Sequence, residues 1–168
     1  MSLILSTSDF TGKYKIGQDN FSDLQSWLDE YEKNYAVQLL GAELYDLFEA
    51  DYNAAPPGEP TDPRFKDIFD PFQKDEEGCL HISLGMKTML KGFVYFEYQR
   101  NGSTFITPSG TTKTEHANDT PASFQEAGIW ERYNRSIETL QQIQWFICEN
   151  ADVYPEYNGQ HLGISFGF

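Results

Sequence analysis

The side chains that most often carry catalysis or bind metals are few in this sequence, and their spacing matches no metal-binding motif. His81, His116 and His161 lie far apart, and none belongs to an H-x-x-x-H or H-E-x-x-H pattern. Cys79 and Cys148 have no second cysteine nearby, which excludes a C-x-x-C redox pair and a zinc ribbon. A metal site would need these residues to converge through folding alone. We therefore expect neither a metal nor a cofactor.

Carboxylate pairs are the second candidate for chemistry, because a glycosidase uses two such groups across a cleft. Glu43 and Asp46 are spaced to share a helical face, and so are Asp29 and Glu32. A hydrolase would also need burial to raise the pKa of one member of the pair. Solvated helix surface explains such pairs more simply, so a small hydrolase stays an alternative without specific support.

Loops that bind calcium or phosphate are not predicted either. The acidic stretch at 70–77 departs from the D-x-[DN]-x-[DN]-G pattern of calcium loops and lacks the closing glutamate. The sequence contains no G-x-x-x-x-G-K-[ST] loop. We expect that the chain is not an enzyme and has no catalytic residues.

An aromatic run at 93–100, Phe-Val-Tyr-Phe-Glu-Tyr-Gln-Arg, could offer a stacking platform for sugars or bases. On a helix, however, these rings spread around the whole axis, which is typical of core packing. Glu97 and Arg100 are three positions apart, so we expect them to pair at the end of this buried helix.

Residues 162–168 alternate large apolar side chains with glycine or serine. In an extended chain, side chains at two-residue spacing lie on one face. Such a strand is an aggregation hazard unless it docks on its own domain or on another chain. Docking on its own core and addition to a neighbouring chain both remain open. We predict that the four apolar residues form an interface: Leu162, Ile164, Phe166 and Phe168.

Charge and composition exclude some classes of ligand. The chain has 12 Lys and Arg against 26 Asp and Glu, a formal net charge of −14. Phosphate binding depends on basic patches, so free nucleic acid is excluded as a ligand of the overall surface. Aromatic residues make up 15%, which indicates a folded protein rich in interfaces. No apolar run is long enough to span a membrane, and no signal peptide is predicted, so we expect an intracellular protein without membrane contact.

The apolar periodicity predicts a mainly α fold, with one domain over 1–168 built as a small bundle of three main helices and one or two short ones. Residues 103–114 predict a projecting β-hairpin, in which Phe105 and Ile106 are available for an interface. The termini, 1–19 and 151–168, are expected to be extended arms, the second with the terminal strand. The body at 20–150 is expected to contain helices at 22–40, 42–52, 63–69, 82–100 and 121–150, a proline-rich loop at 54–63 and an acidic connection at 70–78.

Four segments share the character of one known class of proteins. They are Leu-Leu-Gly-Ala-Glu-Leu-Tyr-Asp-Leu-Phe at 39–48, Tyr-Phe-Glu-Tyr-Gln-Arg at 95–100, Thr-Phe-Ile-Thr-Pro-Ser-Gly at 104–110, and Tyr-Asn at 133–134. Together they resemble head-tail connector proteins (neck adaptors, or head-completion proteins) of tailed bacteriophages, of the type found in phages and prophages of Bacteroidetes. The resemblance spans about 20–150 and rests on structural motifs.

The resemblance implies a structural virion protein, assembled in the cytoplasm of the bacterial host. Identical subunits would form a cyclic ring between the portal protein and the tail or other neck proteins, with hairpin and arms contacting neighbours. An acidic lumen would let DNA pass without specific binding. The alternative is an acidic decoy that mimics DNA and binds a host DNA-binding protein. A decoy needs carboxylates at phosphate-like spacing on one face, and the sequence scatters them.

Overall fold

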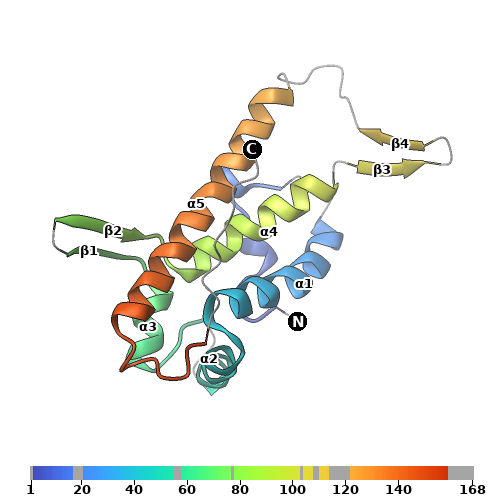
Figure 1. The fold of residues 1–168 in the computed structure, drawn as a ribbon. Coiled ribbons are helices and arrows are strands. Elements are labelled where there is room, and N and C mark those ends of the chain that lie inside the picture. The colour runs from blue at the N-terminus through green and yellow to red at the C-terminus, as the bar shows by residue number, and fades with distance from the viewer. Residues whose placement is uncertain are drawn as a thin grey trace.

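The computed structural model describes residues 2–16, 21–54, 58–76, 78–102, 104–107, 110–113 and 122–158. Within them, five α-helices form a body from which two short β-hairpins project (Figure 1). The helices are α1 (Phe21–Leu40), α2 (Ala42–Ala54), α3 (Pro63–Phe69), α4 (Met86–Gly102) and α5 (Ala122–Glu149). The predicted mainly α fold, a small helical bundle with a hairpin, is confirmed.

Helix α4 is the buried centre of the body, as its apolar circumference predicts. It lies between α1 and α5, and α5 runs back along it in the opposite direction (Figure 1). Met89, Leu90 and Val94 are fully buried. The rings at Phe93, Tyr95, Phe96 and Tyr98 are buried as well, so the aromatic run packs the core and does not form an open stacking platform.

A glycine sets how closely α4 and α5 approach. A Cβ added to Gly92 would overlap Ser136 Oγ and would lie 3.2 Å from the Arg132 carbonyl oxygen. The Ser136 hydroxyl is itself held, because it donates a hydrogen bond to that carbonyl at 3.0 Å. The two helices therefore meet where only a hydrogen side chain fits.

We expect Gly92→Ala to lower the free energy of unfolding by about 1–2 kcal/mol, because overpacking outweighs the gain in helix propensity. Urea denaturation followed by circular dichroism measures the change. The double variant Gly92→Ala with Ser136→Ala should recover much of the loss, since it removes the nearest atom. Equal stability of Gly92→Ala and the parent chain would show that the helices can separate without cost.

Local signals place the short helices where the sequence predicts them. The Asp62 carboxylate accepts a hydrogen bond from the Arg64 N–H at 3.0 Å, and Pro63 occupies the first turn, so α3 begins with a capped N-terminus. Asp51 on α2 accepts hydrogen bonds from the backbone N–H groups of Thr61 and Asp62. These contacts fix the end of the proline-rich loop to the helix before it.

The first described residues, 2–16, are irregular, as expected, apart from the 3-10 turns η1 (Thr7–Asp9) and η2 (Gly12–Tyr14). They are nevertheless packed on their own body, which the expectation of an extended arm did not include. The Glu32 carboxylate on α1 accepts the backbone N–H groups of Leu3, Ile4 and Leu5 at 2.6 to 2.9 Å. Five apolar side chains of this segment are buried in the core: Ile4, Leu5, Phe10, Tyr14 and Ile16.

The residues that follow α5 up to Asn158 are also attached to the body. Tyr154 is buried, and its hydroxyl donates a hydrogen bond to the Arg64 carbonyl at 2.6 Å. Arg64 forms an ion pair with Glu156 at 3.1 Å. The described part of the expected C-terminal arm thus lies against α3.

Both hairpins are two-stranded and antiparallel. The predicted hairpin is confirmed as β3 (Thr104–Thr107) and β4 (Gly110–Lys113), with Phe105 opposite Thr112 and Ile106 opposite Thr111. The expected acidic connection at 70–78 is wrong, because β1 (Phe72–Glu76) pairs there with β2 (Cys79–Ser83). The helix expected from Ile82 consequently begins at Met86.

Candidate interaction surface

The β1–β2 hairpin is held to α5 by one of its two faces. On β2, the His81 ring stacks on Trp145 with centroids 3.6 Å apart, and its Nδ1 lies 2.8 Å from Gln142 Oε1. On β1, Lys74 Nζ lies 3.9 Å from the centre of the Phe146 ring, a cation–π contact. Lys74 and His81 are opposite each other in the register, so these contacts belong to a single inner face.

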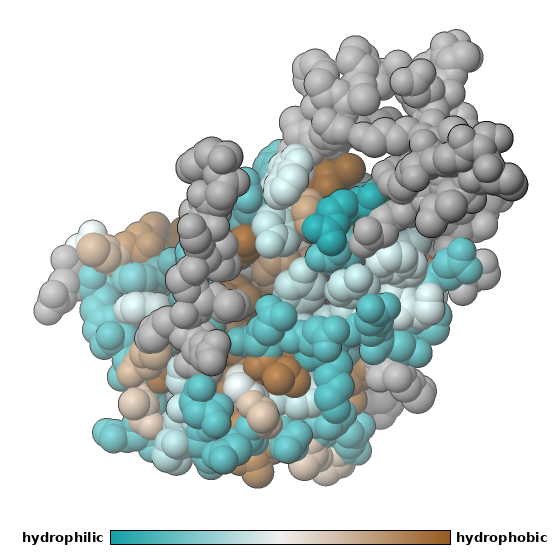
Figure 2. Space-filling model, turned by 45° about the vertical axis from the view of Figure 1, so that its right-hand side comes forward, coloured by the Kyte–Doolittle hydropathy of each residue, from teal (hydrophilic) through white to brown (hydrophobic). Residues whose placement is uncertain are grey.

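The outer face of the same hairpin carries two apolar side chains that nothing in the described residues covers. Leu80 and Ile82 alternate with the inward His81, and they are 55% and 48% exposed. Figure 2 shows this apolar surface in brown where the hairpin extends from the body, at the left of the view. Exposed apolar side chains at two-residue spacing on a two-stranded ribbon are typical of a surface that binds another polypeptide.

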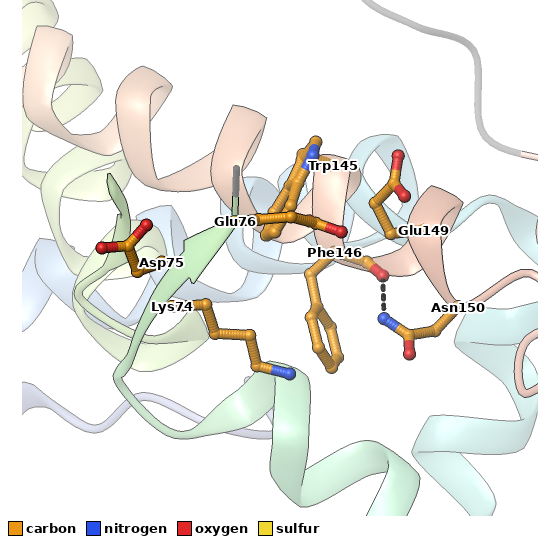
Figure 3. A pocket seen from close by; sticks show the side chains of 7 residues that line it. All are labelled: Lys74, Asp75, Glu76, Trp145, Phe146, Glu149 and Asn150. Carbon is orange, nitrogen blue, oxygen red and sulfur yellow. Dashed lines mark hydrogen bonds between the residues drawn. The ribbon is translucent and has the colours of Figure 1, made fainter. Parts of the chain in front are cut away.

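A pocket lies between β1 and the C-terminal end of α5 (Figure 3). Its volume is about 260 Å³, and Trp145 and Phe146 supply its aromatic wall. Lys74 extends toward the Phe146 ring, while Asp75, next to it on β1, points the other way (Figure 3). The pocket is also lined by Glu76, Glu149 and Asn150, and the Asn150 amide donates a hydrogen bond to the Phe146 carbonyl at 2.8 Å.

This pocket offers shape and charge to a partner. It holds neither a histidine nor a hydroxyl or thiol nucleophile that a base could activate. Across the part of the chain that the structure describes, no group of three or more His, Cys, Asp and Glu side chains could hold a metal ion. Asp70, Asp75 and Glu76 are exposed, the last two on β1, which gives them the geometry of a strand and not of a calcium loop.

A second surface gathers half-buried rings on α1 and α5 beside α4. Tyr35 on α1 stacks on Phe93, with the ring centroids 4.2 Å apart. Trp130 on α5 is 52% exposed, and the centroid of its ring lies 5.0 Å from that of Phe96. The Tyr35 hydroxyl donates a hydrogen bond to Glu97 at 2.8 Å. Burial and the neighbouring Glu97 carboxylate together raise the pKa of Tyr35, which keeps its hydroxyl protonated as a donor.

The predicted pair of Glu97 and Arg100 is confirmed, with 3.1 Å between Arg100 Nη2 and Glu97 Oε2. The two side chains differ in environment, because Glu97 is buried whereas Arg100 is 59% exposed. The contact therefore places an exposed charged group at the edge of the aromatic surface, 5.6 Å from the centre of the Phe96 ring.

The candidate carboxylate pairs of the sequence do not form a cleft. Asp29 and Glu32 both bind backbone N–H groups of residues 2–5, so they attach the N-terminal segment. Burial raises the pKa of Glu32, and its three N–H donors oppose that rise. Glu43 and Asp46 are both exposed on α2. These carboxylates are structural or solvated, and none faces a second one across a pocket.

The predicted interface residues fall mainly outside what the structure describes. Phe105 and Ile106 lie in β3, where the backbone register is described and the side chains are not. The four predicted interface residues of the tail lie outside the described residues, because the last described residue is Asn158. They are Leu162, Ile164, Phe166 and Phe168.

The same tail carries the letters of a catalytic motif, since Gly163, Ser165 and Gly167 match G-x-S-x-G. In an α/β hydrolase this serine sits between a strand of a mainly parallel sheet and the following helix. The sheets in the described residues are two antiparallel hairpins. Among the described residues, no parallel sheet supplies the context that a nucleophile elbow requires.

The described residues contain no helix that is both long and apolar enough to cross a membrane. Searches of curated proteins and of solved structures found no match to the chain. A family model matches residues 36–166, which reach from the second half of α1 to the alternating tail. The chain therefore belongs to the family of unknown function DUF6712.

Proposed function

We propose that this protein is a structural assembly protein, a subunit of the ring that connects head and tail in a tailed bacteriophage. The observation that carries the proposal is the placement of the two hairpins, which project from the helical body in opposite directions (Figure 1). A subunit of a closed ring contacts a neighbour on each side through two different surfaces. Two opposed ribbons on a rigid body supply surfaces of that kind.

The exposed apolar pair on one ribbon supports the same conclusion. A two-stranded ribbon is marginally stable by itself and leaves strand edges open. The β1–β2 hairpin leans on α5 through His81 and Lys74, yet turns Leu80 and Ile82 to the outside. Contact with a neighbouring subunit would cover these side chains and the open edge.

The charge of the chain suits the passage of DNA through such a ring. The net charge of −14 on each subunit repels phosphate at long range, so a genome could slide past without binding. The portal on one side and the tail or other neck proteins on the other are the partners that this proposal requires. Its place is the virion, after assembly in the bacterial cytoplasm.

Deletion of the gene from the phage or prophage that encodes it tests the proposal. We expect filled heads and free tails that do not join, and restoration of joined particles when the parent chain is supplied in trans. A chain with Leu80→Ser and Ile82→Ser should not restore them. Leu47→Ser is the matched control, because Leu47 is 40% exposed and belongs to α2, which lies away from both hairpins (Figure 1). Normal virions without the gene would refute the proposal.

A further inference from the structure

We infer that the outer face of the β1–β2 hairpin is a docking site for residues 162–168 of a second copy of this chain. The inference rests on the proposed ring and names the two surfaces that meet in it. The hairpin contributes Leu80 and Ile82, and the incoming segment contributes alternate apolar side chains. One copy's tail would thus add to the next copy's ribbon, a head-to-tail contact.

The spacing of apolar groups is the first argument for this match. Leu80 and Ile82 are two positions apart on one face of a strand, about 7 Å along its axis. The tail repeats large apolar groups at that same two-residue spacing from Leu162 onward. A strand added beside β1 would therefore carry its apolar side chains on the same face of the widened sheet as Leu80 and Ile82, one strand away from them.

The backbone of the hairpin is the second argument. Among the described residues, β1 and β2 form a sheet of only two strands, and β2 is the strand that packs along α5. Residues 73–76 of β1 are exposed, so this strand has an edge at which N–H and carbonyl groups can pair with a further strand. Glycine and serine between the apolar residues of the tail allow close approach of backbone to backbone.

Charge explains why a second copy can approach this face. Each copy carries a net charge of −14, and on this face β1 presents the exposed Asp75 carboxylate, opposite Leu80 in the register. Residues 159–168 contain no Asp, Glu, Lys or Arg side chain. This segment can therefore meet an acidic ribbon without side-chain repulsion, whereas most other parts of a copy cannot.

A binding measurement tests the hairpin as the acceptor. The protein is the full chain with Ile164→Asp and Phe166→Asp, which disables its own tail, and the probe is a fluorescein-labelled peptide of residues 159–168. We expect saturable binding in fluorescence anisotropy, weakened about tenfold or more when Leu80→Ser and Ile82→Ser are added. Leu47→Ser should leave the affinity unchanged. Absence of binding, or equal loss with Leu47→Ser, overturns the docking site.

A mixing experiment tests whether the tail comes from a second copy. The full chain with the disabled tail is mixed with the full chain that carries Leu80→Ser and Ile82→Ser, and sedimentation velocity measures the species. Docking between copies predicts a one-to-one heterodimer and nothing larger, because only one intact tail and one intact hairpin are present. Peptide binding without a heterodimer would mean that each tail docks on its own copy, which overturns the inference. Neither result depends on whether virions need the gene.

Discussion

Replacing Glu32 by alanine is expected to lower the free energy of unfolding by about 3 kcal/mol, since buried N–H groups without a partner cost about 1–3 kcal/mol each. The carboxylate is 2% exposed and accepts the N–H groups of Leu3, Ile4 and Leu5. Without it, the N-terminal segment must either leave these donors unpaired or detach from α1. Detachment would in turn expose apolar side chains that the segment buries, such as Ile4 and Phe10.

Chemical denaturation monitored by circular dichroism measures this loss. Glu32→Gln should cost less than the alanine variant, because an amide oxygen can still accept two of the three donors. Glu30→Ala is the control, since Glu30 is an exposed carboxylate on the same helix and should change stability by less than about 0.5 kcal/mol. If Glu32→Ala and Glu30→Ala behaved alike, the carboxylate would not be what holds the N-terminal segment.

The helices of this protein are predictable from its sequence because each carries its own local signals. Apolar residues recur every three or four positions in α1 and α5, Gly41 separates α1 from α2, and Asp62 with Pro63 begins α3. Such signals act within a few residues, so they can be recognised without knowing the fold.

The N-terminal segment shows what local signals leave out. Leu3, Ile4 and Leu5 are held by Glu32, which lies more than 25 positions away in the sequence. Helical spacing does place Glu32 on the buried stripe of α1, four positions from both Leu28 and Ala36. No pattern near residues 3–5, however, marks this carboxylate as the acceptor of their N–H groups.

The β1–β2 hairpin was missed for a different reason. Ile82 lies just ahead of the strongly apolar run of α4, so the sequence pattern assigns it to that helix. The acidic residues of β1 are typical of a loop, so the pattern predicts no strand there. Two features could have identified it, the alternation of Leu80 and Ile82 and the glycine at 78. Neither outweighs a strong helical pattern next to it, because β structure depends on a partner strand more than on local preference.

The distribution of buried and exposed groups bears on the proposed assembly role. Buried polar groups such as Glu32 and Glu97 are engaged by backbone or side-chain donors. The large apolar side chains that are exposed include Leu80 and Ile82 on a hairpin and Trp130 on α5, whereas Leu47 on α2 and Val153 after α5 are exposed on the body. The exposed Leu80 and Ile82 support the proposed assembly role, because a neighbouring chain would cover them.

Gly85→Ala is expected to reduce the free energy of unfolding by about 3–5 kcal/mol and to disorder the hairpin, because strain and steric overlap act at one position. Gly85 has φ of 83° and joins β2 to α4. A Cβ there would lie 2.8 Å from the Phe69 carbonyl oxygen and 3.0 Å from the Pro71 nitrogen, both backbone atoms. Because α3, β1 and α4 meet at this residue, a shift there changes how the hairpin projects.

Gly78→Ala separates the effect of backbone strain from the effect of steric overlap. Gly78 lies in the β1–β2 turn with φ of 82°, but nothing comes within 4 Å of an added Cβ, so this variant carries only the strain of about 1–2 kcal/mol. Thermal unfolding should therefore rank the parent chain, Gly78→Ala and Gly85→Ala in falling order of stability. Peptide binding should follow the same order, since docking needs the hairpin in place. If the two substitutions had equal effects, Gly85 between β2 and α4 would not fix the position of the β1–β2 hairpin. The contacts with α5 alone would then set the direction of the hairpin.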